Sequence, residues 1–340
     1  MILEGTVLRG RSFEPVEGRV VVEEGEIAAV EEARVSSDDV VLPAFVNAHT
    51  HIGDSIAKEA GAGLSVDELV APPDGLKHRL LEAASREELV TAMRRSLQFM
   101  VESGTGACVE FREGGVEGVR AFEDAGAGLD IESVVLGRET VAAMELADGF
   151  GASGAADDEF GRERAATAEA GKLFGIHAGE VRTGDIHPAL DLEPDYLVHM
   201  VYAEADHLDR VAETGTPVVV CPRANVVTDV GVPPVRDLLD RTTVALGTDN
   251  VMLNSPSMFR EMEFASKLTD ASAAEVLAMA TVNGADIAGL NCGLVAEGRD
   301  ARLLVLDGDS NNLAGARDLV RAIVRRAGTG DVAGVVAPAG

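Results

Sequence analysis

Two histidines stand two residues apart in the stretch PAFVNAHTHIGDS, which covers residues 43–55. Side chains at positions i and i+2 of a β-strand point to the same face, so His49 and His51 can reach one metal ion from a single strand. On a helix the same spacing would separate them by about 200°. Imidazole is a suitable ligand for zinc or ferrous iron, and such a metal lowers the pKa of bound water toward about 7. The pair therefore indicates a hydrolytic metal site.

Further residues with suitable chemistry follow apolar runs along the chain. His177 closes the run KLFGIHA, His199 lies late in DYLVHMVY, and Asp249 follows TVALGT. Glu180 stands three residues after His177, and Gly179 lets the chain turn so that both side chains face one side. A carboxyl group in that place can accept and return a proton. Each residue alone is also compatible with an ordinary turn or surface position, but their joint placement favours one site.

These residues must be positioned by the elements that precede them. Short apolar runs alternate with segments that have apolar residues at helical spacing, such as 85–104 and 203–215. The eight runs are 40–49, 106–111, 130–137, 149–153, 172–178, 195–202, 217–221 and 243–248. Strands that alternate with helices predict an α/β fold, here a parallel (β/α)8 TIM barrel, whose active site forms at the C-terminal ends of the strands. The candidate residues lie at those ends.

The two ends of the chain have a different pattern. Residues 19–33, RVVVEEGEIAAVEEA, form two apolar-rich runs broken at Gly25, which is typical of a hairpin. Residues 301–310, ARLLVLDGDS, predict another strand followed by a turn. Neither end can bury itself alone, so we expect the two ends to pair with each other.

The charge balance is strongly acidic. Asp and Glu total 58 against 29 for Lys and Arg, a formal net charge of -29, and the acidic residues are spread along the chain. The chain has four lysines, at positions 58, 77, 172 and 267. This composition is typical of proteins from salt-loaded cytoplasms, where salt screens the repulsion, and an acidic protein from an ordinary cytoplasm is the alternative. It argues against nucleic-acid binding, which needs a basic face.

Other sequence features predict a cytoplasmic protein with a small-molecule substrate and no membrane partner. No run approaches the roughly 18 apolar residues of a membrane helix. The first residues lack the basic and apolar regions of a signal peptide. Cys108, Cys221 and Cys292 are widely spaced and imply no disulfide framework. Whether copies of the chain associate stays open.

Together these motifs resemble the amidohydrolase superfamily, in the branch of cytosine deaminase, S-adenosylhomocysteine deaminase and the chlorohydrolases. LPAFVNAHTH resembles its metal-binding first strand, HAGE its fifth-strand motif, CPRAN its Cys-Pro-x-Ser-Asn motif at strand seven and GTDN its eighth-strand aspartate. TVNGADIAGL and VAEGRDARLLVLD resemble its C-terminal helix and returning strand. The resemblance covers nearly the whole chain. It implies a small β-sandwich domain from 1–42 plus 292–340 and a hydrolase barrel over 43–291.

The resemblance also implies roles for the site residues. One divalent metal, zinc first with ferrous iron or manganese as alternatives, would be held by His49, His51, His177 and Asp249. Glu180 would shuttle protons, His199 would contact the hydroxide and the reacting centre, and Asp249 would also accept a hydrogen bond from the hydroxide. Relatives with two metals bridge them with a fourth-strand lysine, which GFGASGAADDEF lacks. One metal is therefore predicted, and His199 would be the ligand of any second one.

Four residues are candidates for substrate contacts. Arg112 and Arg138 stand in FREGG and GRET at the ends of strands two and three, and Arg223 stands in CPRAN. Each could bind an anionic or carbonyl group with two hydrogen bonds, and structural ion pairs around the rim are the alternative. Asn250, directly after Asp249, is the fourth candidate.

The predicted reaction is hydrolytic deamination of an aminated heterocycle such as a nucleobase, nucleoside or pterin. The same residues would serve a hydrolase of cyclic amides or amidines of the imidazolonepropionase type. A barrel that binds a metal or ligand without catalysis is a third interpretation, but such a chain would be expected to lose ligands or the proton shuttle, and this chain keeps them.

Overall fold

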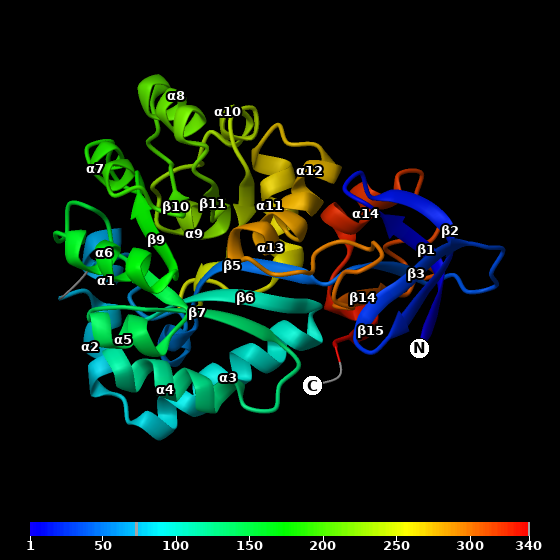
Figure 1. Cartoon of the computed structure of the whole chain (residues 1–340), viewed down its shortest axis with the longest axis horizontal. Coiled ribbons are helices and arrows are strands. Elements are labelled where there is room, and N and C mark those ends of the chain that lie inside the picture. Colours follow the sequence, from blue (N-terminus) through cyan, green and yellow to red (C-terminus); the bar gives the residue numbers. More distant parts are fainter. Residues whose placement is uncertain (72–73, 339–340) are drawn as a thin grey trace.

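The computed structural model describes residues 1–71 and 74–338, which form two sheets and the helices that pack on them (Figure 1). The larger sheet is parallel, with the order β12-β11-β10-β9-β8-β7-β6-β5-β13. Strand β13 (Asp249–Asn250) continues β12 after two residues and pairs with β5, with Asp249 opposite Thr50 and Asn250 opposite His51. The last strand thus returns to the first, and the sheet closes into the predicted (β/α)8 barrel.

The eight barrel strands lie within or next to the predicted runs. They are β5 (Phe45–His51), β6 (Thr105–Arg112), β7 (Glu132–Gly137), β8 (Gly149–Ala152), β9 (Leu173–Ala178), β10 (Tyr196–His199), β11 (Val218–Val220) and β12 (Val244–Leu246). The helices that follow them are α3 (Arg86–Glu102), α4 (Gly115–Gly126), α5 (Val141–Leu146), α6 (Gly161–Ala170), α7 (Ile186–Asp191), α8 (Ala205–Thr214), α9 (Pro222–Val227), α10 (Val235–Leu239), α11 (Met258–Leu268), α12 (Ala273–Met279) and α13 (Val282–Ala288). Between β5 and α3 lie a 3-10 segment η1 (Ile52–Ala57) and two short helices, α1 (Val66–Val70) and α2 (Leu76–Ala83).

The predicted first strand, 40–49, is wrong as a single element. It is two strands, β4 (Val40–Pro43) in the smaller sheet and β5 in the barrel. The break falls at Ala44, whose N–H donates to the carbonyl of Arg302, directly after Pro43, which has no backbone N–H and ends β4. Both strands are buried along their whole length, so hydrophobicity alone could not separate them.

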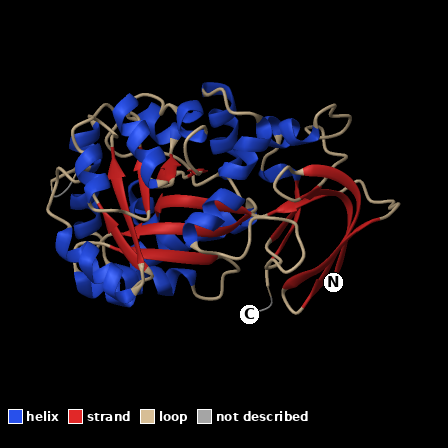
Figure 2. Ribbon diagram, turned by 45° about the horizontal axis from the view of Figure 1, so that its top comes forward, coloured by secondary structure: helices blue, strands red, loops and turns tan. Residues whose placement is uncertain are grey.

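The smaller sheet is built from strands near both ends of the chain, as expected, and it lies beside the barrel (Figure 2). Its order is β15-β14-β4-β1-β2-β3. The other strands are β1 (Ile2–Arg9), β2 (Glu14–Glu23), β3 (Glu26–Glu32), β14 (Leu303–Leu306) and β15 (Val332–Val336). The predicted hairpin at Gly25 is confirmed by the antiparallel pairing of β2 with β3. Near the C-terminus, η2 (Thr329–Asp331) precedes β15, and α14 (Leu319–Arg326) packs against α11 and α12.

The barrel interior is filled below its C-terminal end. Phe111 and Tyr196 are fully buried there, and the Phe111 ring meets the rings of His49 and His177 edge-on, with centroids 4.7 and 5.1 Å away. This aromatic floor carries the histidines that point toward the barrel mouth. Within the described ranges no helix has the length and apolar character needed to cross a membrane.

Candidate active site

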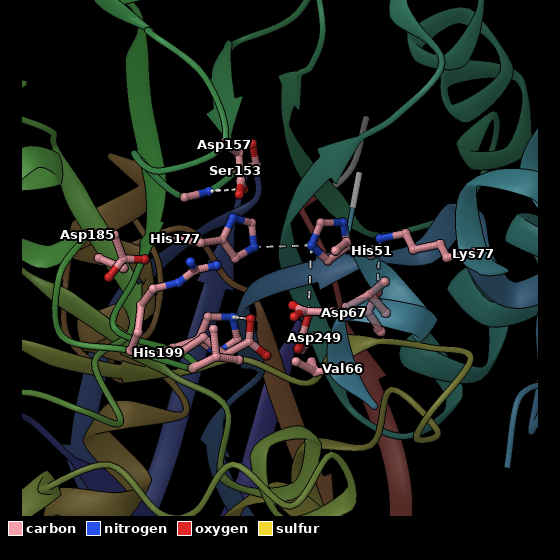
Figure 3. A pocket seen from close by; sticks show the side chains of 18 of the residues that line it. His51, Val66, Asp67, Lys77, Ser153, Asp157, His177, Asp185, His199 and Asp249 are labelled. Carbon is pink, nitrogen blue, oxygen red and sulfur yellow. Dashed lines mark hydrogen bonds and ion pairs between the residues drawn. The ribbon is translucent and has the colours of Figure 1, made fainter. Parts of the chain in front are cut away.

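The structure brings the predicted metal-binding residues together at the C-terminal ends of the barrel strands. His49 Nε2 lies 3.4 Å from Asp249 Oδ1, and His51 Nε2 lies 3.7 Å from the same oxygen. His51 Nε2 also lies 3.4 Å from His177 Nε2, and Figure 3 shows both rings turned toward each other. His49 and His51 come from β5, His177 from β9 and Asp249 from β13. The first and last strands of the barrel therefore share one cluster.

This arrangement fits a metal ion. His177 Nδ1 lies 2.8 Å from the carbonyl oxygen of Ala152, so Nδ1–H donates there and the Nε2 lone pair faces the cluster. With metal–ligand bonds of about 2.0–2.1 Å, tetrahedral ligands lie about 3.3 Å apart, close to the separations observed. Among the residues that the structure describes, neither ring nitrogen of His49 has a hydrogen-bond partner, although the side chain is fully buried. A buried polar group in this state fits a metal ligand.

The protonation states also suit metal binding. Burial lowers the pKa of His49 and His177, and burial together with Lys77 lowers the pKa of His51 to about 3. These rings are therefore neutral at neutral pH, with free lone pairs. Burial opposes ionisation of Asp249, but His49 and the other histidines hold its pKa well below the usual range.

Two residues of the candidate site, His199 and Asp249, have unusual backbone conformations. His199 has φ of 80° and Asp249 has φ of 59°, in the left-handed region that costs a residue other than glycine about 1–3 kcal/mol. Two glycines assist the arrangement. Gly179 has φ of 65° and turns the chain out of β9, as predicted. A Cβ on Gly247 would lie 2.7 Å from the Cβ of His49, so only glycine lets the last strand approach the first so closely.

Glu180 and His199 face each other beside the metal cluster. Glu180 Oε2 lies 3.6 Å from His199 Nε2, and its side chain is 23% exposed. Burial raises the pKa of Glu180, which suits a group that exchanges protons near neutral pH. On the other side of the His199 ring, Nδ1 accepts a hydrogen bond from Asn225 Nδ2 at 3.2 Å. That bond leaves the proton of His199 on Nε2, directed at Glu180.

A cavity of about 100 Å³ opens in front of the cluster. The predicted residues that line it are His51, Arg138, His177, Glu180, His199, Asp249 and Asn250, while His49 lies beneath it. The structure does not bring Arg112 or Arg223 to this cavity. Arg112 is buried against Glu110, with Nη1 3.4 Å from Oε1, and Arg223 Nε lies 2.6 Å from Glu261 Oε2. Both arginines therefore make the structural ion pairs that were the alternative for them.

Sequence reasoning missed two buried charged residues, Lys77, which lines the cavity, and Glu113, which contacts His51. Lys77 Nζ lies 2.6 Å from Glu113 Oε1, and the same oxygen lies 2.7 Å from His51 Nδ1 and 3.3 Å from Arg138 Nη1. Glu113 is the residue after Arg112 in FREGG, and Lys77 is one of only four lysines in an acidic chain. The rarity of lysine was the available signal.

Comparison with known proteins points to the family that the sequence motifs resemble. The amidohydrolase family model matches residues 40–207 and 190–337. A relative from Methanothermobacter thermautotrophicus that bears the name aminohydrolase is 35% identical over 351 aligned positions, which cover 90% of this chain and 91% of the relative. A 5-methylthioadenosine/S-adenosylhomocysteine deaminase from Haloarcula marismortui is 30% identical, with 94% of this chain and 87% of the relative covered.

Solved structures resemble the fold. An adenosine deaminase from Xanthomonas campestris with bound zinc superposes with a TM-score of 0.77 at 18% identity, and the match covers 99% of this chain and 91% of that chain. At this identity the likeness extends to the barrel and the sheet of the termini.

Proposed function

The chain belongs to the amidohydrolase family and is a hydrolase of carbon–nitrogen bonds, and from that premise we propose that it deaminates an aminated heterocycle such as a nucleobase, nucleoside or pterin. The observation that carries the proposal is the position of His51 Nε2, which lies 3.4 Å from His177 Nε2 and 3.7 Å from Asp249 Oδ1, beside a carboxyl group that faces His199. The deaminase name of the Haloarcula marismortui relative supports an amino group as the leaving group.

We propose one divalent metal, held by His49, His51, His177 and Asp249. Zinc is the first choice, since the adenosine deaminase from Xanthomonas campestris binds zinc, with ferrous iron or manganese as alternatives. When bound, such a metal lowers the pKa of water to about 7 and so supplies a nucleophile at neutral pH. Strand β8, GFGA, carries no lysine that could bridge two metals, which supports a single ion.

The residues of the chain would then move the protons. Glu180 accepts a proton from the attacking water and passes it to a ring nitrogen of the substrate. It then carries the proton of the newly added hydroxyl group to the amino group, so that ammonia leaves and the carbonyl group of the product forms. The raised pKa of Glu180 lets this residue both accept and donate a proton. The Nε2–H of His199 donates a hydrogen bond to the oxygen that adds to the carbon, where negative charge develops. Asp249, held ionised, accepts a hydrogen bond from the attacking water.

Substrate would enter through the cavity, where Arg138 and Asn250 remain the candidates for substrate contacts. We expect a small-molecule substrate and a cytoplasmic enzyme, and the strongly acidic composition supports a salt-loaded cytoplasm.

An ammonia-release screen of the zinc-loaded protein over aminated heterocycles tests the proposal, with cyclic amides and amidines run beside them in high salt. Release of ammonia with the matching keto product is the expected result. Turnover of cyclic amides alone would assign the imidazolonepropionase type of reaction instead. Absence of metal after reconstitution with zinc, ferrous iron or manganese would overturn the site assignment.

A further inference from the structure

We propose that Lys77 is a positioning residue of the metal centre, which holds one ligand from the first barrel strand and one from the last through two intermediate side chains. The inference rests on the proposed metal site. It goes beyond that site because Lys77 lies on α2, outside the repeating strands and helices of the barrel. Figure 3 shows Lys77 reaching the cluster from the side of His51.

One ammonium group contacts the partners of both ligands. Lys77 Nζ lies 2.6 Å from Glu113 Oε1, and that oxygen lies 2.7 Å from His51 Nδ1. Lys77 Nζ also donates to Asn250 Oδ1 at 2.9 Å, and Asn250 Nδ2 donates to Asp249 Oδ1 at 2.8 Å. His51 and Asp249 belong to strands that meet where the barrel closes. The lysine therefore fixes the relative position of two ligands across the closure.

The chemistry of the contacts suits this role. A carboxylate at Nδ1 of a histidine favours the tautomer with the proton on Nδ1, so the lone pair of His51 stays on Nε2, toward the cluster. Lys77 Nζ and Arg138 Nη1 lie 2.6 and 3.3 Å from Glu113 Oε1, so this buried carboxylate faces two cations. The Asn250 amide orients the Asp249 carboxylate in the same way.

The contacts around Lys77 are buried, so each side chain in them depends on the others. The side chains of Lys77 and Glu113 are each 3% exposed, so each charge relies on the other rather than on water. The other lysines differ, because Lys58 and Lys267 are exposed and Lys172 is half-buried. Partners of metal ligands typically change metal affinity by about 10- to 100-fold when they are removed. We expect an effect of this size from Lys77, although it touches no ligand of the proposed metal.

The test measures zinc affinity of the metal-free full-length chain by competition with a chromophoric chelator. Lys77→Met should raise the Kd for zinc by about 10- to 100-fold. Lys267→Met, on the exposed face of α11, is the matched control and should leave the Kd unchanged. Thermal unfolding of the metal-free proteins separates positioning from folding, because a positioning role requires lost affinity in a chain that still unfolds cooperatively.

Glu113→Gln provides a second variant of nearly identical shape, which keeps the inference testable if Lys77→Met does not fold. It should also weaken zinc binding, and in the double variant the two losses should be smaller than the sum, because both act along one chain of contacts. A wild-type chain that binds no metal would overturn the proposed function. A wild-type chain that binds zinc, with both variants at wild-type affinity, would overturn the role of Lys77 alone.

Discussion

The two sides of the candidate site are held by different kinds of contact. On the side of β5 and β6, His51 is backed by Glu113, which is backed in turn by Lys77 and Arg138. On the side of β9 to α9, His177 donates to a backbone carbonyl and His199 accepts from the amide of Asn225. Buried charged groups hold the histidine on the first side, and hydrogen bonds to uncharged groups hold the histidines on the second side.

This difference separates two tasks of the site. Burial and the charge of Lys77 lower the pKa of His51 to about 3, which suits its proposed role as a metal ligand. The neutral partners of His199 leave its Nε2–H and the facing Glu180 as the groups that can respond to a substrate. Metal binding should therefore depend most on the charged side, and proton transfer on the neutral side.

The largest expected effect is on the neutral side. Glu180→Gln removes the group that moves protons, so kcat should fall by about 10²- to 10⁴-fold. The bound metal should stay, because Glu180 is not among its proposed ligands. Metal content by plasma mass spectrometry, measured on the same sample as turnover, distinguishes the two roles. Wild-type turnover in this variant would remove Glu180 from the mechanism.

A charged pair outside the cavity serves as a reference for the charged side. Arg223→Met leaves Glu261 buried without its ion partner and should lower the free energy of unfolding by about 3–5 kcal/mol. KM of the protein that remains folded should change little. Arg260→Met, exposed on the same helix as Glu261, should stay within about 0.5 kcal/mol. A raised KM with unchanged denaturant unfolding would make Arg223 a candidate for substrate contact again.

Asn225→Ala is a smaller change on the neutral side than Glu180→Gln. Asn225→Ala removes one hydrogen bond to His199, with a net value of about 0.5–1.5 kcal/mol. Turnover should therefore fall by no more than about tenfold, while zinc affinity stays at the wild-type value. Asn311→Ala, at an exposed position, is the control. Loss of zinc affinity in Asn225→Ala, comparable to that expected for Lys77→Met, would abolish the distinction between the two sides.

The smallest expected effect concerns the surface rather than the site. Exposed acidic side chains repel one another at a net charge of -29, and this repulsion is screened by salt. Raising KCl from 0.1 to 2 M, about a fourfold shortening of the screening length, should raise the thermal midpoint by a few degrees. The ratio of zinc affinities between wild type and Lys77→Met should stay nearly constant, because that pair is buried. A ratio that collapses in salt would mean that solvent reaches Lys77.

The proximity of the candidate metal ligands could be predicted from the sequence because strand geometry constrains it. His49 and His51 share a strand face, and parallel strands bring their C-terminal ends together, so His177 and Asp249 could be assigned to the same place. The alternation of side chains along β6 also separates Arg112 from Glu113. Phe111 faces the barrel interior with the core, so Arg112 must point outward to Glu110, and Glu113 points inward again.

Lys77 could not be predicted in this way. It lies on a short helix between β5 and α3, with no periodic relation to the barrel strands. Its contacts join residues 36 and 173 positions away in the chain, which no local pattern encodes. Arg223 shows the same limit, because its partner Glu261 lies 38 residues further on.

The closure of the barrel has a consequence for the order of events during synthesis. The proposed ligand set spans the seam between β5 and β13, so it includes residues from position 49 to position 249. A ribosome must release nearly three quarters of the chain before Asp249 can reach His49, and Gly247 packs closely against that histidine. Earlier strands can pair and earlier helices can pack without any ion. Metal binding would therefore follow closure of the barrel and would not guide the early steps of its folding.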